Sequence, residues 1–363
     1  MKERDLVIIG GGPAGLSAAL VALQNGLYVT IIERSFKLGG QLIKQTHKFF
    51  GSEKQYAKTR GLDIAKKLIE DLEPYVDHLE IYLDAAVVGL YKDKVCTVYR
   101  NEKYFKIQAK AIIVATGASE KFIAFENNDL PGIYGAGAVQ TLMNQYGVLP
   151  GEKIVMVGSG NIGLIVSYQL MQAGVEVACV LEAAPKIGGY LVHASKLRRL
   201  GVPIYTSRTI LRAEGNESVE KVITVALDSS WKMIEGSEIE YNVDAVCISV
   251  GLTPMHQLLS MAEIMMRFIP ELGGMVPVIS KDHETSLENV FVCGDVIGVE
   301  EASSAIVEGK LAGLIASKRF NQNIPNYEDM LAELHTQLHI LRSGPFGKKT
   351  TTGLAKLQEA THA

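Results

Sequence analysis

The sequence has no C-x-x-C pair. Its four cysteines lie far apart, each within an apolar or β-branched run: Cys96, Cys179, Cys247 and Cys293. This placement is typical of small buried side chains on strands, so we expect no redox-active dithiol, no iron–sulfur cluster and no zinc site. Unpaired cysteines also suit a reducing compartment, and we therefore expect a cytoplasmic protein.

A basic stretch that could follow a nucleic acid is also missing. Lys and Arg number 36 against 40 Asp and Glu, which gives a net charge of −4, and both signs are dispersed along the chain. We therefore expect no nucleic-acid partner. The hydrophobic share of 47% is that of a folded globular protein, and 363 residues suggest about two domains.

Two long runs, residues 6–32 and 154–175, contain no charged side chain. About 20 apolar residues suffice to cross a bilayer. Each run, however, is broken near its start by glycines and contains Asn and Gln, so we expect no membrane span. His335 and His339 are four residues apart on an expected helix, but no third ligand is nearby, so we expect no metal site.

The same two runs contain one motif twice. Each has a β-branched run, then G-x-G-x-x-G, a helical segment, a glycine, a second β-branched run and a Glu. The glycines are Gly10, Gly12 and Gly15 in the first copy and Gly158, Gly160 and Gly163 in the second, and the acids are Glu33 and Glu182. In such a motif the glycines allow a tight turn, a close pyrophosphate and close helix packing, and the acid binds ribose hydroxyls. We therefore predict two dinucleotide-binding folds.

The acid of the second copy bears on the choice of nicotinamide cofactor. A carboxylate at Glu182 would repel a ribose 2′-phosphate, and residues 183–189 contain no Arg. The sequence therefore favours NAD(H) over NADP(H), although Lys186 could still reach a phosphate.

Three further strand-like segments end in glycine. One ends in Thr116-Gly117, one in Gly251 and one in Gly294-Asp295. A glycine there lets a ligand approach the backbone, and Asp295 could bind a polyol hydroxyl.

This order of motifs resembles the flavoproteins with two dinucleotide-binding domains, of which thioredoxin reductase is one. The resemblance implies an α/β protein with two Rossmann-like three-layer domains, the NAD domain being inserted into the FAD domain. It implies an FAD-binding domain at 1–120 and 280–325, an NAD(P)-binding domain at 121–279 and a C-terminal helical tail at 326–363.

The resemblance also implies which residues bind each cofactor. For FAD they are Gly10, Gly12, Pro13, Ala14, Gly15, Glu33, Arg34, Gly40, Gln41, Thr116, Gly117, Gly294, Asp295 and Ala302. For NAD they are Gly158, Gly160, Asn161, Ile162, Gly163, Glu182 and Gly251. The helix that opens at 301–304 would point its N–H groups at the flavin N1 and O2 atoms.

The chain departs from thioredoxin reductase because the inserted domain has no C-x-x-C. Residues 39–51 also lack the single cysteine of the peroxide-linked relatives. We therefore expect neither disulfide reduction nor cysteine-based peroxide chemistry.

A narrower resemblance links residues 130–144, 183–204 and 298–309 to the flavin subunits of amine and imino acid dehydrogenases. That group includes dye-linked L-proline dehydrogenase, opine oxidase, the hydrogen cyanide synthase flavoprotein and sarcosine oxidase α. Several of these relatives have a C-terminal cysteine cluster, which we expect to be missing here because no cysteine follows Cys293.

The expected function is an FAD-dependent oxidoreductase that transfers hydride between NAD(H) and flavin, as a flavin subunit or relative of those dehydrogenases. The second substrate is a small molecule or an electron acceptor, and a second flavoprotein subunit would make a hetero-oligomer; a homo-oligomer is also open. One alternative is an NADH:acceptor reductase that passes electrons to a quinone, ferredoxin or dye. Another is a non-catalytic redox sensor that binds both nucleotides.

Two histidines and the tail leave alternatives open. His47 could move a proton beside the flavin, or be an ordinary solvated loop residue. His193 could line the nicotinamide side, or cap a helix. In the tail, apolar side chains recur at helical spacing (Leu331, Leu334, Leu338 and Leu341), so this helix either packs on the FAD domain or docks against a second chain.

Overall fold

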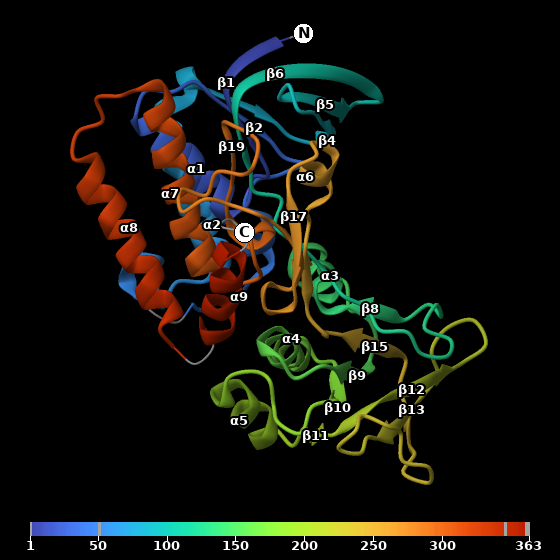
Figure 1. Ribbon diagram of the computed structural model, residues 1–363. Coiled ribbons are helices and arrows are strands. Elements are labelled where there is room, and N and C mark those ends of the chain that lie inside the picture. Colours follow the sequence, from blue (N-terminus) through green and yellow to red (C-terminus); the bar gives the residue numbers. More distant parts are fainter. Residues whose placement is uncertain (1, 50–51, 345–346, 360–363) are drawn as a thin grey trace. The chain divides into compact units, whose positions relative to one another are not determined.

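The computed structural model describes residues 2–49, 52–344 and 347–359. Its chain divides into two compact units (Figure 1). The first unit holds Met1–Ser119 and Thr253–Ala363, and the second holds Glu120–Leu252. The predicted insertion of one α/β unit into another is confirmed.

A seven-stranded sheet forms the centre of the first unit. Its strand order is β3-β2-β1-β6-β5-β4, and β19 also pairs with β6. Strands β3, β2, β1, β6 and β19 are parallel, whereas β4, β5 and β6 form an antiparallel meander. The strands are β1 (Lys2–Ile9), β2 (Val29–Ile32), β3 (Leu79–Tyr82), β4 (Ala86–Leu90), β5 (Val95–Arg100), β6 (Lys103–Val114) and β19 (Val290–Val292).

Helices cover one face of this sheet. Leu6 and Ile8 of β1 point to that face, because successive side chains of a strand alternate between its two sides. Helix α7 lies against α1 along much of its length (Figure 1). The helices of this face are α1 (Pro13–Gln24), α2 (Gly61–Glu70), α7 (Ala302–Phe320) and α8 (Tyr327–Arg342). Short 3-10 turns link these elements: η1 (Gly40–Lys44), η2 (Glu53–Gln55), η3 (Glu73–His78) and η5 (Gly294–Val296).

The opposite face of the sheet corrects one predicted boundary. Val7 and Ile9 share their core with Leu259, Ile269 and Val276, which we had assigned to the second domain. The chain thus returns to the first unit at Thr253 rather than at residue 280, because these apolar side chains complete the second face of the first sheet. The elements concerned are α6 (Gln257–Met261), β17 (Met266–Ile269), η4 (Pro270–Leu272) and β18 (Gly274–Pro277).

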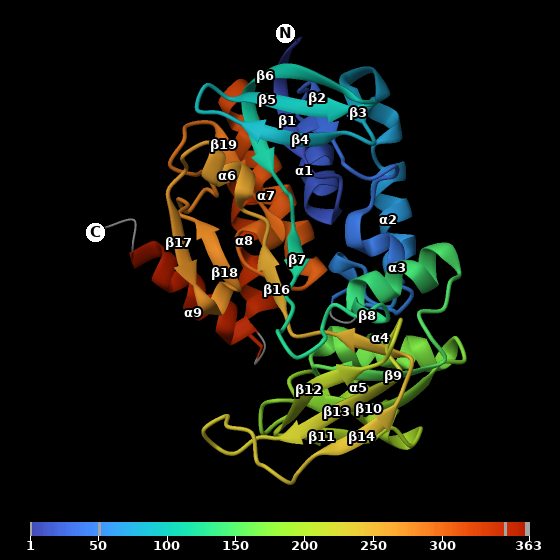
Figure 2. The same cartoon turned by 90° about the vertical axis from the view of Figure 1, so that its right-hand side faces the viewer.

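The second unit has a five-stranded parallel sheet with the order β11-β10-β9-β15-β8. Helices α3, α4 and α5 cover one face, and an antiparallel three-stranded sheet covers the other (Figure 2). The elements are β8 (Ile133–Gly135), α3 (Ala136–Tyr146), β9 (Lys153–Val157), α4 (Asn161–Gln172), β10 (Glu176–Glu182), α5 (Leu191–Arg199), β11 (Ile204–Thr206), β12 (Arg208–Glu214), β13 (Lys221–Ala226), β14 (Ile239–Asn242) and β15 (Ala245–Ile248). The short strands β7 (Ala118–Glu120) and β16 (Leu252–Pro254) carry the chain between the units and pair with each other.

The tail is helical, as predicted, and it packs on its own chain. Leu334 and Leu338 of α8 are buried in the core beside α7, and Leu331 and Leu341 pack against the same core. Of the two alternatives for this helix, packing on the first unit is confirmed. Helix α9 (Gly347–Glu359) follows, and its Leu357 is buried on the opposite face of the sheet. Residues 345–346 and 360–363 of the predicted tail lie outside the described residues.

The cysteines are buried, as predicted, and none is in a disulfide. Burial raises the pKa of Cys96 to about 12, and it raises the pKa of Cys293 well above its usual value. Thiols of this kind are poor nucleophiles, since the thiolate is the reactive form.

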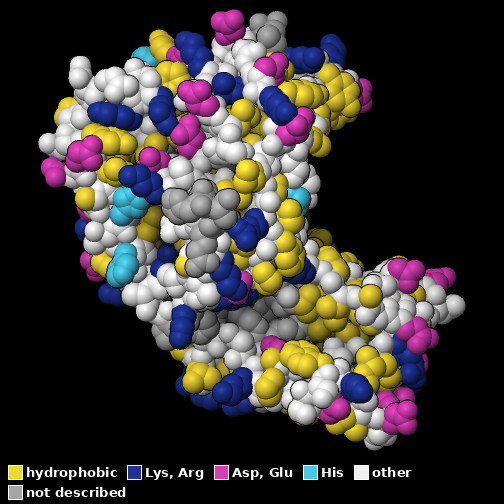
Figure 3. Space-filling model, viewed as in Figure 1, with side chains coloured by type: hydrophobic (Ala, Val, Ile, Leu, Met, Phe, Trp, Pro, Cys, Tyr) yellow, Lys and Arg dark blue, Asp and Glu magenta, His cyan; other side chains and the backbone are white. Residues whose placement is uncertain are grey.

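The surface in Figure 3 intersperses acidic and basic side chains. None of the helices in the described ranges combines the length and the apolar character that a bilayer crossing needs.

Candidate functional site

The first glycine loop connects β1 to α1, and two of its glycines are required by packing. Gly10 has φ of +113°, and a Cβ there would lie 2.3 Å from the Ala115 carbonyl oxygen. A Cβ on Gly15 would lie 1.9 Å from the Gly10 oxygen. At Gly12, the N-cap of α1, the nearest atom to a Cβ would be Gly40 Cα, 3.8 Å away. The middle glycine thus leaves room beside the backbone where a pyrophosphate can approach the helix N-terminus.

The second loop, between β9 and α4, has the same geometry. A Cβ on Gly158, where φ is +108°, would lie 2.1 Å from the Ser249 oxygen, and one on Gly163 would lie 2.2 Å from the Gly158 oxygen. At Gly160 nothing lies within 4 Å. Both loops therefore fit a dinucleotide phosphate in the way the motif predicts.

The two predicted acids are held against their loops by equivalent bonds. Glu33 accepts hydrogen bonds from the N–H groups of Gly11 (2.7 Å) and Ser35 (2.8 Å). Glu182 accepts from the N–H of Ser159 (3.1 Å), from the Ser159 hydroxyl (2.5 Å) and from the N–H of Ala184 (2.9 Å). Each carboxylate is thus fixed beside a glycine loop, at the end of the neighbouring strand.

The repeat extends further than the two motif copies identified in the sequence. Six residues after each acid the chain has a Gly-Gly pair, Gly39-Gly40 and Gly188-Gly189. The N–H of Gly39 donates to the Gly11 oxygen, and that of Gly189 donates to the Ser159 oxygen, both at 2.8 Å. The K-[LI]-G-G pattern that both copies share in the sequence could have predicted this second contact between the chain and each glycine loop.

The neighbouring predicted residues occupy the starts of the helices. Pro13 and Ala14 open α1, and Asn161 and Ile162 open α4. The Asn161 side chain accepts the N–H of Tyr190 at 2.8 Å, which ties the second Gly-Gly segment to the helix start. Gln41 lies exposed in η1, and Arg34 is exposed directly after Glu33.

Strands β6 and β15 end in equivalent glycines. Gly117 lies three residues after Val114, and Gly251 lies three residues after Ile248; their φ angles are +74° and +121°. A Cβ on Gly117 would meet nothing within 4 Å, so this backbone is open to a ligand. The Thr116 hydroxyl donates to the Met255 oxygen at 2.8 Å and fixes the strand end.

The Gly294-Asp295 turn is the feature that distinguishes the two copies. It follows β19, which pairs with β6 as β8 pairs with β15 in the second unit. By this register Gly294 corresponds to Gly137 and Asp295 to Ala138, so the second copy has no acid at this place. Ala302 begins the 19-residue helix α7 just beyond the turn.

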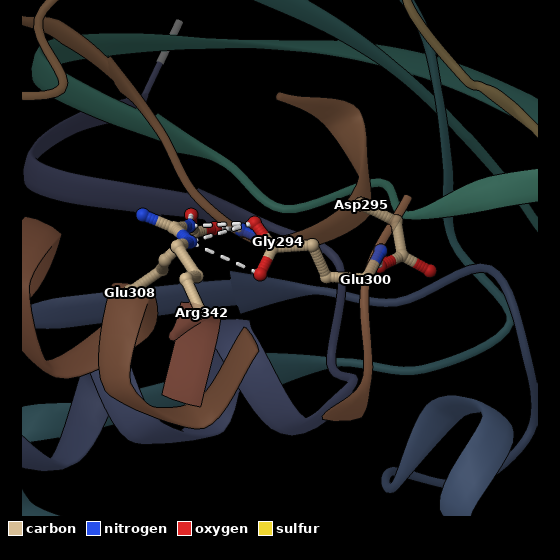
Figure 4. Close-up of polar contacts among 5 residues, drawn as sticks. All are labelled: Gly294, Asp295, Glu300, Glu308 and Arg342. Carbon is tan, nitrogen blue, oxygen red and sulfur yellow. Dashed lines mark hydrogen bonds and ion pairs between the residues drawn. The ribbon is translucent and has the colours of Figure 1, made fainter. Parts of the chain in front are cut away.

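Burial raises the pKa of Asp295 to about 7, and the negative charges of Glu308 and Glu300 act in the same direction. The N–H of Glu300, which donates to Asp295 at 3.3 Å, opposes this shift. Glu308 also accepts the N–H of Gly294 at 2.8 Å, and Arg342 binds both Glu300 and Glu308 (Figure 4). Sequence reasoning missed these three residues.

The two candidate histidines lie on different units. His47 follows η1, and its ring stacks on Phe49 with centroids 5.9 Å apart. A role for His47 in proton transfer remains a prediction. His193 is buried in the first turn of α5, and burial, together with the nearby charge of Lys196, lowers its pKa. His335 and His339 are exposed on α8, as expected of surface residues.

Comparisons with known proteins agree with this geometry. The family model for pyridine nucleotide-disulphide oxidoreductases matches residues 4–309. An opine oxidase subunit of Agrobacterium tumefaciens is 25% identical over 86% of this chain and 65% of its own length. L-Proline dehydrogenase from P. horikoshii is 28% identical, with a TM-score of 0.68 over 91% of this chain and 59% of its own. Thioredoxin reductase of T. acidophilum, at 20% identity, shares the fold with a TM-score of 0.71 over 88% of this chain and 99% of its own. The chain thus spans about three fifths of the first two relatives.

Proposed function

The chain belongs to the pyridine nucleotide-disulphide oxidoreductase family, and on this premise we propose that it binds FAD at the first glycine loop and NAD(H) at the second. Hydride transfer between NAD(H) and the flavin is then its reaction. The observation that carries the proposal is the pair of matched loops, each with an open middle glycine (Gly12 and Gly160) and a carboxylate fixed beside it.

Asp295 supports the assignment of FAD to the first loop. A flavin dinucleotide has a ribityl chain whose hydroxyls need hydrogen-bond acceptors, and a nicotinamide dinucleotide has none. The first copy has a carboxylate at the turn after its fifth strand, and the second has Ala138 at the corresponding position.

Glu182 supports NAD(H) rather than NADP(H) at the second loop. Its two oxygens are already held by Ser159 and Ala184, so the carboxylate cannot easily turn away from a ribose 2′-phosphate. Bringing two negative groups together would weaken NADP(H) binding.

When bound, FAD supplies the hydride chemistry, and the chain's own residues position it. The N-terminal N–H groups of α7, from Ala302 onward, present the positive end of a 19-residue helix. No thiol serves as a relay, because all four cysteines are buried and unpaired. Reducing equivalents must therefore leave the flavin directly for a small molecule or a second protein.

The second substrate is proposed to be an amine or imino acid, or an electron acceptor, handled together with a second flavoprotein subunit. Support comes from similarity to L-proline dehydrogenase and to one subunit of opine oxidase. This chain covers 65% of the opine oxidase subunit and 59% of L-proline dehydrogenase.

The experiment is an anaerobic titration of the FAD-loaded protein with NADH and then NADPH, following the flavin absorbance band. Bleaching by NADH and not by NADPH supports both nucleotide assignments. Failure to bind FAD contradicts the proposal, and bound FAD that NADH does not reduce contradicts hydride transfer in this chain.

Addition of proline, opines or their imino forms then tests the substrate class. Turnover only with a quinone, ferredoxin or dye would favour the NADH:acceptor reductase. Binding of both nucleotides without turnover would favour a redox sensor.

A further inference from the structure

A buried ionic cluster joins the tail helix α8 to the turn after β19 (Figure 4). Arg342 Nε lies 3.0 and 3.1 Å from the two carboxylate oxygens of Glu300, and its Nη2 donates to Glu300 at 2.6 Å. The same Nη2 donates to Glu308 of α7. The side chains of Arg342, Glu300 and Glu308 are 11%, 10% and 4% exposed. We call these three residues the tail cluster.

The tail cluster holds both residues of the Gly-Asp turn. The second oxygen of Glu308 accepts the N–H of Gly294 at 2.8 Å. The N–H of Glu300 donates to the carboxylate of Asp295 at 3.3 Å. The two acids that bind Arg342 therefore also hold the turn: Glu308 binds the backbone of Gly294, and Glu300 binds the side chain of Asp295.

Charge balance makes Arg342 essential to this arrangement. One guanidinium against two carboxylates leaves a net charge of −1 beside Asp295, itself an acid. Without the guanidinium the net charge would be −2 in a poorly hydrated site, where unpaired charges are costly. Repulsion would then favour opening of the turn.

We propose that Arg342 is a positioning residue for the flavin site, acting through Glu300 and Glu308 on the Gly294-Asp295 turn. The inference rests on the proposed binding of FAD at the first loop. It gives the tail a function beyond packing, since α8 supplies Arg342, the cation that among the described residues binds both carboxylates.

A purely structural role for α8 makes a different prediction. Among the described residues, two other side-chain hydrogen bonds join the helix to the rest of the first unit, Lys54 to Glu333 at 2.8 Å and Gln55 to Gln337 at 2.7 Å. The Lys54–Glu333 pair is more than half exposed and lies outside the tail cluster. Lys54→Gln therefore loosens the same helix without changing the buried charge.

The titratable groups around Arg342 decide how pH affects the turn. On the side of α7 and the turn, these groups are Asp295, Glu300 and Glu308. The loop before β19 adds His283, whose pKa is lowered by burial and by the charges of Arg342 and His335, so that its ring stays neutral. Low pH protonates the acids and relieves their repulsion, so the effect of losing Arg342 should be largest at high pH.

The test measures FAD dissociation constants of the full chain by flavin fluorescence at about pH 6 and about pH 9. Arg342→Gln should weaken FAD binding at least about tenfold at the higher pH and by less than about threefold at the lower. The double variant Glu300→Gln/Arg342→Gln restores the net charge of −1 and should bind within about threefold of the wild type. Lys54→Gln should bind like the wild type.

The outcomes separate the two proposals. A wild-type chain that does not bind FAD overturns the proposed function, and this inference with it. If the wild type binds FAD, then Arg342→Gln with unchanged affinity, or with a loss equal at both pH values, overturns the inference alone. If Arg342→Gln does not fold, the double variant decides: folded protein with wild-type affinity supports the role of charge, whereas folded protein with weak binding overturns it.

Discussion

His283 should make the folded protein sensitive to acid. It lies at a turn before β19 with φ of +57°, it is 8% exposed, and its Nδ1 has no hydrogen-bond partner among the described residues. Burial, together with the charges of Arg342 and His335, lowers its pKa to about 4 from an ordinary value of 6.5. The imidazole therefore stays neutral in the folded state at pH values where the unfolded chain would already be protonated.

The sign and size of the effect follow from this difference. The folded state binds fewer protons than the unfolded state between pH 6.5 and about 4, so stability is present above this window and is lost as the pH falls through it. The full shift in the pKa of His283 corresponds to about 3 kcal/mol in the free energy of unfolding, of which about 2 kcal/mol is lost by about pH 5.

The variant His283→Asn tests this, because Asn tolerates a positive φ and does not titrate. The assay is urea unfolding at about pH 8 and about pH 5. Between these pH values the wild type should lose about 2 kcal/mol more stability than the variant. His339→Gln, on the exposed surface of α8, is the control and should keep the wild-type pH dependence. Equal pH dependence in His283→Asn and the wild type would refute the reasoning.

Three further predictions concern the second loop and the acid beside it. Gly163→Ala should destabilise the protein by about 2 kcal/mol in urea unfolding, because its Cβ would lie 2.2 Å from the Gly158 oxygen. Gly160→Ala meets no atom within 4 Å, so it should change stability by less than about 1 kcal/mol yet abolish flavin bleaching by NADH, and normal bleaching would count against the loop as the NAD site. Glu182→Gln should reduce the preference for NADH over NADPH about tenfold in anaerobic reduction rates. Glu176→Gln, at the exposed start of the same strand, should leave that preference unchanged.

The sequence was most informative where the physics is local. Gly15 could be predicted because a turn from strand to helix forces a close backbone contact with Gly10, five residues earlier. The buried cysteines could be predicted because each lies in an apolar run. The helical tail followed in the same way from the spacing of its leucines.

Long-range features could not be predicted. Arg342 meets Glu300 and Glu308 across 42 and 34 residues, and no periodicity in the sequence links them. The boundary at Thr253 was missed for a related reason. The sequences of β17 and β18 are typical of apolar strands, and they do not indicate which sheet these strands cover.

The two units also show why chain order hides their equivalence. Strands β3-β2-β1-β6-β19 of the first unit correspond in position to β11-β10-β9-β15-β8 of the second. In the second unit the fifth strand, β8, comes before the glycine loop; in the first, β19 comes after the entire insertion. We propose that Asp295, an acid that only the first unit has at the turn after its fifth strand, makes two nearly identical loops favour different dinucleotides. The same late return brings α7 and the tail next to the turn, and this is how Arg342 comes to lie beside the proposed flavin site.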